Sequence, residues 1–130
     1  MLKLLTICLL FPLITYSQDL YSTMSLTYVW NGKRPEIIDM SKSVTYFRFH
    51  KDYIYINGET KNLCYIVSKY QTDSLMIDAF DCLDDDERRF FISKSFDNST
   101  ITIVHGYLIT KYYNVIPLKS DEKFRYTRFF

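Results

Sequence analysis

Glycine and proline are scarce in this 130-residue chain, with three of each, and cysteine also occurs only three times. A chain with so few glycines is poorly suited to the glycine-rich loop that cradles a phosphate group, and no such motif is present. The sequence also lacks a Gly-x-Ser-x-Gly elbow for a nucleophilic serine. It has no internal repeat and no low-complexity segment, which favours one globular domain.

An excess of either charge is missing too. Sixteen basic residues stand against fifteen acidic ones, and the formal net charge is +1. A nucleic-acid-binding domain shows a basic excess or a basic stripe. We therefore expect no nucleic acid among the partners of this chain.

Long apolar runs are absent except at the N-terminus. Residues 4–14 are mostly apolar, Lys3 precedes them, and Thr15 and Ser17 supply small side chains at alternate positions before Gln18. This pattern predicts a signal peptide over residues 1–17 with cleavage before Gln18. A bilayer-spanning helix needs roughly 20 apolar residues, so an uncleaved anchor or a core helix is the weaker alternative.

Export has three consequences for the rest of the chain. Residues 18–130 are expected to form one β-rich domain with a short C-terminal tail from about residue 119. The domain is expected in the periplasm or outside the cell, without a transmembrane anchor. Removal of Lys3 leaves basic and acidic residues balanced at fifteen each.

Aromatic residues are abundant, with twelve tyrosines and ten phenylalanines. Residues 44–49 and 53–56 alternate between apolar and polar types around a Lys51-Asp52 turn. A two-residue loop would pair Phe49 with Ile54 and Phe47 with Ile56, which puts all four side chains on one face. The alternation therefore predicts a β-hairpin packed on a core.

Similar runs predict an all-β antiparallel meander of about eight strands, and Pro35 is expected to open one helical turn over residues 35–40. Short strands joined by polar turns favour a barrel or half-barrel, with a β-sandwich as the alternative. The expected strands cover residues 25–30, 44–49, 53–56, 61–70, 75–82, 89–96, 101–105 and 107–116.

The segment Trp30-Asn-Gly-Lys33 and the aromatic hairpin over residues 44–57 resemble small bacterial lipocalin-like domains. The resemblance covers about residues 25–118. It does not include the Gly-x-Trp signature of larger lipocalins, since Tyr28 and Val29 precede the tryptophan. The resemblance implies a lipocalin-like architecture and an apolar ligand pocket.

Two cysteines, Cys64 and Cys82, remain after Cys8 leaves with the signal peptide. Exported proteins encounter an oxidising compartment, so this pair is a candidate disulfide. A three-residue loop at residues 72–74 would place the two cysteines directly opposite each other. The alternative is a pair of buried free thiols, and neither alternative provides a reactive thiol.

Metal, cofactor and catalytic sites are not expected. The acidic run at residues 81–87 lacks the pattern of an EF-hand loop and reads as a solvated hairpin loop. His50 and His105 each lack a second ligand at zinc-binding spacing. A secreted hydrolase that binds calcium through the acidic run remains an alternative.

Trp30, Tyr46, Tyr53 and Tyr55 are the candidate contact residues. Several of these rings fall on the strand face opposite the predicted core, and an exposed aromatic face is typical of a binding surface. The sequence therefore predicts an exported, non-enzymatic domain that binds a partner protein or an apolar small ligand. A periplasmic inhibitor or immunity-type protein is a second alternative, and tyrosines that only stabilise the sheet are a third.

Overall fold

The structure is a computed structural model that describes residues 17–118. Within that range the chain forms eleven β-strands. In chain order they are β1 (Gln18–Ser22), β2 (Met24–Trp30), β3 (Pro35–Ser41), β4 (Thr45–Phe49), β5 (Tyr53–Asn57), β6 (Lys61–Thr72), β7 (Ile77–Leu83), β8 (Arg89–Ser95), β9 (Ile101–His105), β10 (Leu108–Tyr113) and β11 (Ile116–Pro117).

All the strands belong to one antiparallel sheet with the order β11-β1-β4-β5-β6-β7-β8-β9-β10-β2-β3. The prediction of an all-β antiparallel fold is confirmed, and β4 to β10 form an uninterrupted meander. The sandwich alternative is wrong, because the strands form one sheet rather than two. A closed barrel is also wrong, because the hydrogen-bonded order ends at β11 on one side and β3 on the other.

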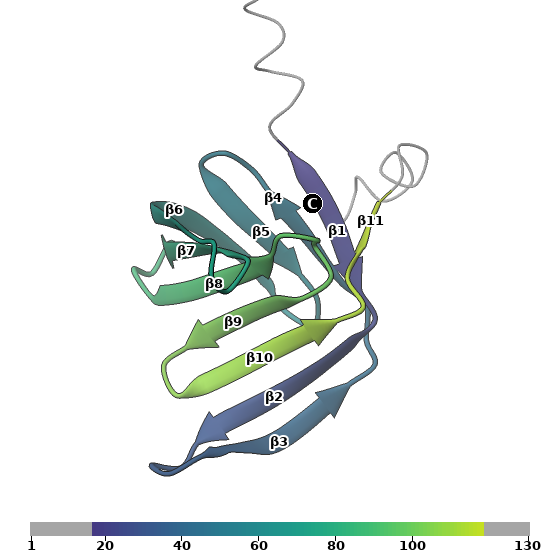
Figure 1. The fold of residues 1–130 in the computed structure, drawn as a ribbon, viewed down its shortest axis with the longest axis vertical. Helices are drawn as coiled ribbons and strands as arrows, with labels where there is room; N and C mark the ends of the chain where they lie inside the picture. The colour runs from purple at the N-terminus through teal and green to yellow at the C-terminus, as the bar shows by residue number, and fades with distance from the viewer. Residues whose placement is uncertain (1–16, 119–130) are drawn as a thin grey trace, which may run out of the picture.

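The sheet nevertheless curls strongly. Only Thr23 separates β1 from β2, although these strands lie near opposite ends of the sheet order. The chain bends there, and Figure 1 shows β10 and β11 bending at the same corner. The buried hydroxyl oxygen of Ser22 lies 2.7 Å from the carbonyl oxygen of Tyr113 and 3.0 Å from that of Met24, so one side chain contacts both bends.

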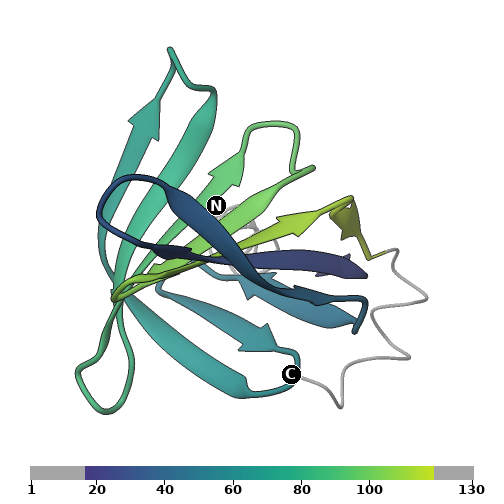
Figure 2. The same ribbon diagram turned by 90° about the horizontal axis from the view of Figure 1, so that it is seen from below.

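The core fills one part of the concave side. Side chains alternate along each strand, and the inward set from β1 and from β4 to β9 is mostly apolar. Figures 1 and 2 show the curvature that brings these strands around a common interior. The buried cluster consists of Leu20, Phe47, Phe49, Ile54, Ile56, Cys64, Cys82, Phe90, Ile92, Ile101, Ile103 and Val115.

The predicted hairpin over β4 and β5 is confirmed in its register. Phe47 lies opposite Ile56 and Phe49 lies opposite Ile54, and all four side chains are buried. Tyr53 and Tyr55 alternate with the two isoleucines along β5, so their side chains point to the convex side. Local alternation and a two-residue turn were sufficient to specify this unit because both strands bury the same face.

Lys94 on β8 lies among these inward side chains and is 8% exposed. Its Nζ donates to the Asn98 side-chain oxygen at 2.6 Å and to that of Gln18 at 3.2 Å, and it lies 3.8 Å from an Asp78 oxygen. Burial lowers the pKa of Lys94, and Asp78 opposes that shift. The lysine thus links β8 to β1 across the interior.

Residues 35–40 form a strand, so the expected helical turn is wrong. β3 pairs with β2 along its length, and the register shifts between Thr27 and Tyr28 at a β-bulge. An isolated helical turn would make few hydrogen bonds for the dihedrals it fixes. Pairing with β2 satisfies more backbone groups, and it outweighs the local preference set by Pro35.

The candidate disulfide is not formed, and Cys64 and Cys82 are buried free thiols. The β6–β7 turn is longer than expected, because Thr72 pairs with Ile77, and a bulge falls between Ile66 and Ser68. Cys82 therefore pairs with Ile66, which leaves Cys64 diagonal to it. Diagonal neighbours in a sheet lie roughly 7–8 Å apart, beyond the usual Cα separation for a disulfide.

Residues 1–16, which contain nearly all of the predicted signal peptide, lie outside the described residues, as does the predicted tail from residue 119. Ser17 is exposed, and β1 begins at Gln18, the residue predicted to follow the cleavage site. No helix among residues 17–118 is long and apolar enough to cross a membrane.

Candidate functional site

A pocket of about 410 Å³ occupies the part of the concave side that the apolar core does not fill. Its walls come from β2 and β3 on one side and from β4, β5 and the β5–β6 turn on the other. The lining residues are Ser25, Thr27, Asp39, Ser41, Ser43, Thr45, Ile56, Gly58, Glu59, Thr60, Asn62, Phe90, Ile103, His105, Leu108, Thr110 and Tyr112.

The wall made by β2 and β3 is polar because of its register. Ser25 lies opposite Ser41, and Thr27 lies opposite Asp39, so four polar side chains share the inward face. The hydroxyl oxygens of Thr27 and of Thr110 on β10 lie 3.3 Å apart and form a hydrogen bond. Alternation thus gives β2 and β3 a hydrophilic inner face, whereas β4 and β5 mostly present apolar residues.

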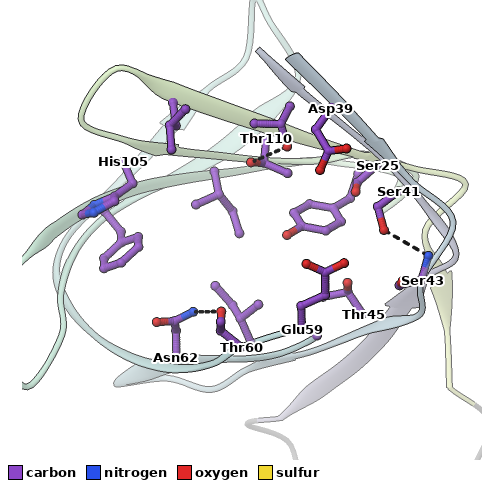
Figure 3. Close-up of a pocket in the computed structure, with 17 residues that line it drawn as sticks. Ser25, Asp39, Ser41, Ser43, Thr45, Glu59, Thr60, Asn62, His105 and Thr110 are labelled. Atoms are coloured by element: carbon purple, nitrogen blue, oxygen red, sulfur yellow. Dashed lines mark hydrogen bonds between the residues drawn. The ribbon is translucent and has the colours of Figure 1, made fainter. Parts of the chain in front are cut away.

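The opposite wall depends on a close backbone approach at Gly58. A Cβ atom at this position would lie 2.8 Å from Oγ1 of Thr45. Glycine therefore lets the β5–β6 turn pack directly against Thr45. The turn then presents Glu59 and Thr60 to the pocket, as Figure 3 shows.

The floor of the pocket is apolar and continuous with the core. Ile56, Phe90, Ile103 and Leu108 contribute aliphatic or aromatic surface. Tyr112 completes the floor, and burial raises its pKa, with a further rise from the negative charge of Glu59. A ligand in the pocket would therefore rest on an apolar surface and meet polar groups at the walls.

Among residues 17–118 the lining contains two carboxylates, Asp39 and Glu59, and no lysine or arginine. Figure 3 shows them projecting into the pocket from opposite walls. Nδ1 of His105 lies 3.1 Å from the carbonyl of Arg89, and its ring stacks on Phe90 at a centroid distance of 4.3 Å. Within residues 17–118 the lining therefore has carboxylates without lysine or arginine counterparts.

Two buried hydroxyl groups of the lining, those of Ser25 and Thr45, have no hydrogen-bond partner within the described part of the chain. Ser25 is 9% exposed and Thr45 is 7% exposed, and both side chains line the cavity. No side-chain oxygen in residues 17–118 is both sealed from solvent and unpaired, so these two hydroxyls reach the pocket space. Buried polar groups are normally paired, which marks these hydroxyls as groups that a ligand or water would satisfy.

The predicted contact residues Tyr46, Tyr53 and Tyr55 lie on the convex face of β4 and β5, away from the pocket, and are partly buried. The ring of Tyr46 lies 6.4 Å from that of Tyr21, and Tyr53 stacks on His50 at 4.4 Å. The structure thus brings the three tyrosines onto two neighbouring strands, where they also make contacts within the sheet.

Trp30, the fourth predicted contact residue, is the last residue of β2 and about half exposed. Its side chain falls on the face opposite that of Thr27. Its backbone N–H donates to the carbonyl of Tyr107 at 3.4 Å. Because β2 pairs with neither β4 nor β5, Trp30 is not part of the same patch as the tyrosines.

The acidic run ends in the β7–β8 hairpin loop, where the carboxylate of Asp84 is bound by the protein itself. Asp84 is buried, its Oδ1 accepts from the backbone N–H groups of Asp86 and Arg88, and its Oδ2 accepts from Nε of Arg88 at 2.8 Å. Burial raises the pKa of Asp84, but the hydrogen bonds from Arg88 outweigh it and hold that pKa below its usual range. Within residues 17–118 no group of three or more His, Cys, Asp or Glu side chains could hold a metal ion.

Sequence reasoning missed the pocket residues Ser25, Asp39, Thr45 and Glu59. A signal was present, because polar residues alternate at positions 39, 41, 43 and 45 as they would on one face of an extended chain. The expected helical turn over residues 35–40 hid that pattern. Nothing local in the sequence indicates that Glu59 faces Asp39.

Comparison with known proteins provides no independent guide to the site. No family model matches the chain, and no curated protein or solved structure matches it either.

Proposed function

We propose that this protein is an exported, non-enzymatic binding domain that takes up a small molecule in the concave pocket. The observation that carries the proposal is the pair of unpartnered hydroxyls, Ser25 and Thr45, in a pocket of about 410 Å³. Small-molecule sites typically have volumes of about 300–1,000 Å³, with apolar surface and a few placed polar groups. This pocket has both properties.

The curled sheet supports the same use. Strands supply the walls, so most lining side chains are held by backbone ladders rather than by long loops. The lipocalin-like resemblance leads to the same proposal, since it implies a ligand on the concave side of a curved meander. The expected apolar ligand fits the floor of Ile56, Phe90 and Ile103, whereas the walls require polar groups on the ligand as well.

A ligand screen by thermal unfolding tests this proposal. A compound that binds only the native state at 100 times its Kd stabilises the protein by roughly 2.7 kcal/mol. Thr110→Trp places a large ring in the pocket, and Lys111→Trp places the same ring on the opposite face of the same strand. We expect hits to stabilise the natural protein and Lys111→Trp but not Thr110→Trp.

Two results would overturn the proposal. One is a broad screen of small molecules that yields no compound able to raise the Tm of the natural protein. The other is a set of hits that stabilise Thr110→Trp as strongly as Lys111→Trp, which would place binding outside the pocket.

A second proposal is that the convex face binds a partner protein, as an inhibitor or immunity-type protein would. The observation in its favour is that Tyr46, Tyr53 and Tyr55 share one face of two adjacent strands and stay partly accessible. Alanine substitution of these residues and of Trp30 should abolish capture of a specific partner without changing the far-ultraviolet circular dichroism. If the variants still capture the partner, or if they lose their circular dichroism signal because they no longer fold, the tyrosines have only a structural role.

A further inference from the structure

We infer that the pocket selects a primary amine, with the ammonium group between Asp39 and Glu59 and an apolar body on the floor. This inference rests on the proposed function and adds the chemical class of the ligand. It is carried by the charge of the lining and by the two unpartnered hydroxyls.

The charge argument begins with the two carboxylates. Asp39 projects from β3 and Glu59 from the β5–β6 turn, on opposite sides of the space (Figure 3). Within the described part of the chain no lysine or arginine lines the pocket to neutralise them. An anionic ligand would be repelled by both groups, whereas a cation is attracted to both. The lining therefore selects positive charge.

The carboxylates have few partners in the protein. Oδ1 of Asp39 accepts one hydrogen bond, from the backbone N–H of Met40 at 2.9 Å. The carboxylate of Glu59 has no hydrogen bond or ion pair within the described residues. Carboxylates accept up to about four hydrogen bonds between their two oxygens, so both groups retain capacity for a ligand.

The hydroxyl groups favour an ammonium group in particular. Ser25 pairs with Ser41 at a point two residues from Asp39 on β3, and Thr45 lies beside the turn that carries Glu59. Each wall thus offers a carboxylate together with a nearly buried hydroxyl that can accept a hydrogen bond. An ammonium group has three donors and no acceptor, which matches a set of carboxylate and hydroxyl acceptors.

The floor determines the rest of the ligand. Ile56, Phe90, Ile103 and Leu108 form a surface on which an alkyl or aromatic body would lose contact with water. A divalent cation would leave this surface unused, and residues 17–118 contain no group of three potential ligands for one. An amine with an apolar body uses both parts of the pocket.

Calorimetric titration with matched compounds tests the inference. The probes are phenethylamine, its neutral analogue phenethyl alcohol, 3-phenylpropionate, the diamine cadaverine and glucose. We expect phenethylamine to bind at least about tenfold more tightly than the neutral alcohol, a ratio that corresponds to about 1.4 kcal/mol. 3-Phenylpropionate should not bind, and affinity for the amine should fall as salt concentration rises.

Asp39→Asn and Glu59→Gln are the decisive variants. Both side chains are exposed, and asparagine keeps the oxygen that accepts from Met40, so both variants should fold. Each should weaken amine binding about tenfold, and the double variant should lose the preference for amine over alcohol. Asp85→Asn removes an exposed carboxylate from the acidic loop and should leave affinity unchanged.

The possible results separate the inference from the function on which it rests. If phenethyl alcohol or glucose binds in the pocket as tightly as the amine, or if the two variants keep full amine affinity, the inference is wrong and the binding function stands. If the whole screen and all these probes fail to bind, both proposals fall. Tighter binding of cadaverine than of phenethylamine would overturn the apolar-body part of the inference.

Discussion

The rings of Phe47 in β4 and Tyr112 in β10 meet edge to face, with centroids 4.8 Å apart and an interplanar angle of 79°. Five strands, β5 to β9, lie between these two in the sheet order. The contact therefore spans the concave side rather than neighbouring strands. It separates the apolar core, which contains Phe47, from the pocket, which Tyr112 lines.

Phe47→Ala should destabilise the protein by about 3–5 kcal/mol, because a fully buried ring is lost and a cavity remains. Urea denaturation followed by tyrosine fluorescence or circular dichroism measures the change. Phe91→Ala is the matched control, since that ring lies on the convex face and is 38% exposed. Equal losses of unfolding free energy in the two variants would show that the contact of Phe47 across the concave side adds no stability beyond that of a partly exposed ring.

Asp19 and Arg48 provide a second test of the sheet. Asp19 is buried, and the guanidinium of Arg48 donates to both of its oxygens, at 2.8 and 3.1 Å, between the neighbouring strands β1 and β4. Arg48→Met leaves that carboxylate without its charged partner. Breaking a fully buried pair costs about 3–5 kcal/mol of unfolding free energy. We expect a smaller loss here, because the arginine is partly exposed.

The control for this pair is the double variant Asp19→Asn with Arg48→Met. It removes the orphaned charge, so it should recover part of the stability that Arg48→Met loses. A double variant less stable than Arg48→Met in chemical denaturation would contradict the account based on an uncompensated buried carboxylate.

Gly58 and Thr45 should show strong energetic coupling. Gly58→Ala brings a Cβ to 2.8 Å from Oγ1 of a buried, β-branched side chain. Overpacking of this kind costs about 1–3 kcal/mol. Thr45→Ala removes the clashing atom, so the double variant should be more stable than Gly58→Ala alone. Additive losses in a double-mutant cycle would rule out the clash as the cause.

The thiols of Cys64 and Cys82 should be inert in the native protein. Burial raises the pKa of Cys64 to about 11 and that of Cys82 to about 12, with smaller contributions from nearby negative charges. A thiol reagent at pH 8 should therefore label neither cysteine until denaturant is added, and both afterwards. A native mass lower by two hydrogens, with no labelling after unfolding, would instead demonstrate a disulfide.

The same raised pKa values predict a pH effect on stability. In the unfolded chain these thiols ionise near their ordinary value of 9.0, whereas the native state keeps them protonated. The contribution of the two protonated thiols to the unfolding free energy is therefore fully present below about pH 9, and it is lost as the pH rises through about 11 and 12. The Cys64→Ala and Cys82→Ala double variant should show a weaker decline in unfolding free energy above pH 9.

The mature protein should begin at Gln18. The signal-peptide pattern places the cleavage before this residue, and β1 begins there, so cleavage would leave the whole sheet intact. Expression of the full chain in a host with signal peptidase, followed by N-terminal sequencing of the exported protein, measures the site. Retention of residues 1–17 on a cell-associated protein would contradict the prediction.

The sequence by itself determined the local units of this fold. Alternation and a short turn specified the β4–β5 hairpin and its register, because pairing with a period of two admits few arrangements that bury one face. Short alternating runs joined by polar turns indicated an antiparallel β-domain. These inferences needed only neighbours within a few residues of each other along the chain.

Tertiary structure alone decided how those units close around an interior. The bend between β1 and β2 and the placement of the β2–β3 hairpin beside β10 depend on partners far away in the sequence. The bulge in β6 and the longer β6–β7 turn separated the two cysteines. The curl brought Asp39 to face Glu59, and an alternation pattern cannot encode which strands will face each other across a concave sheet.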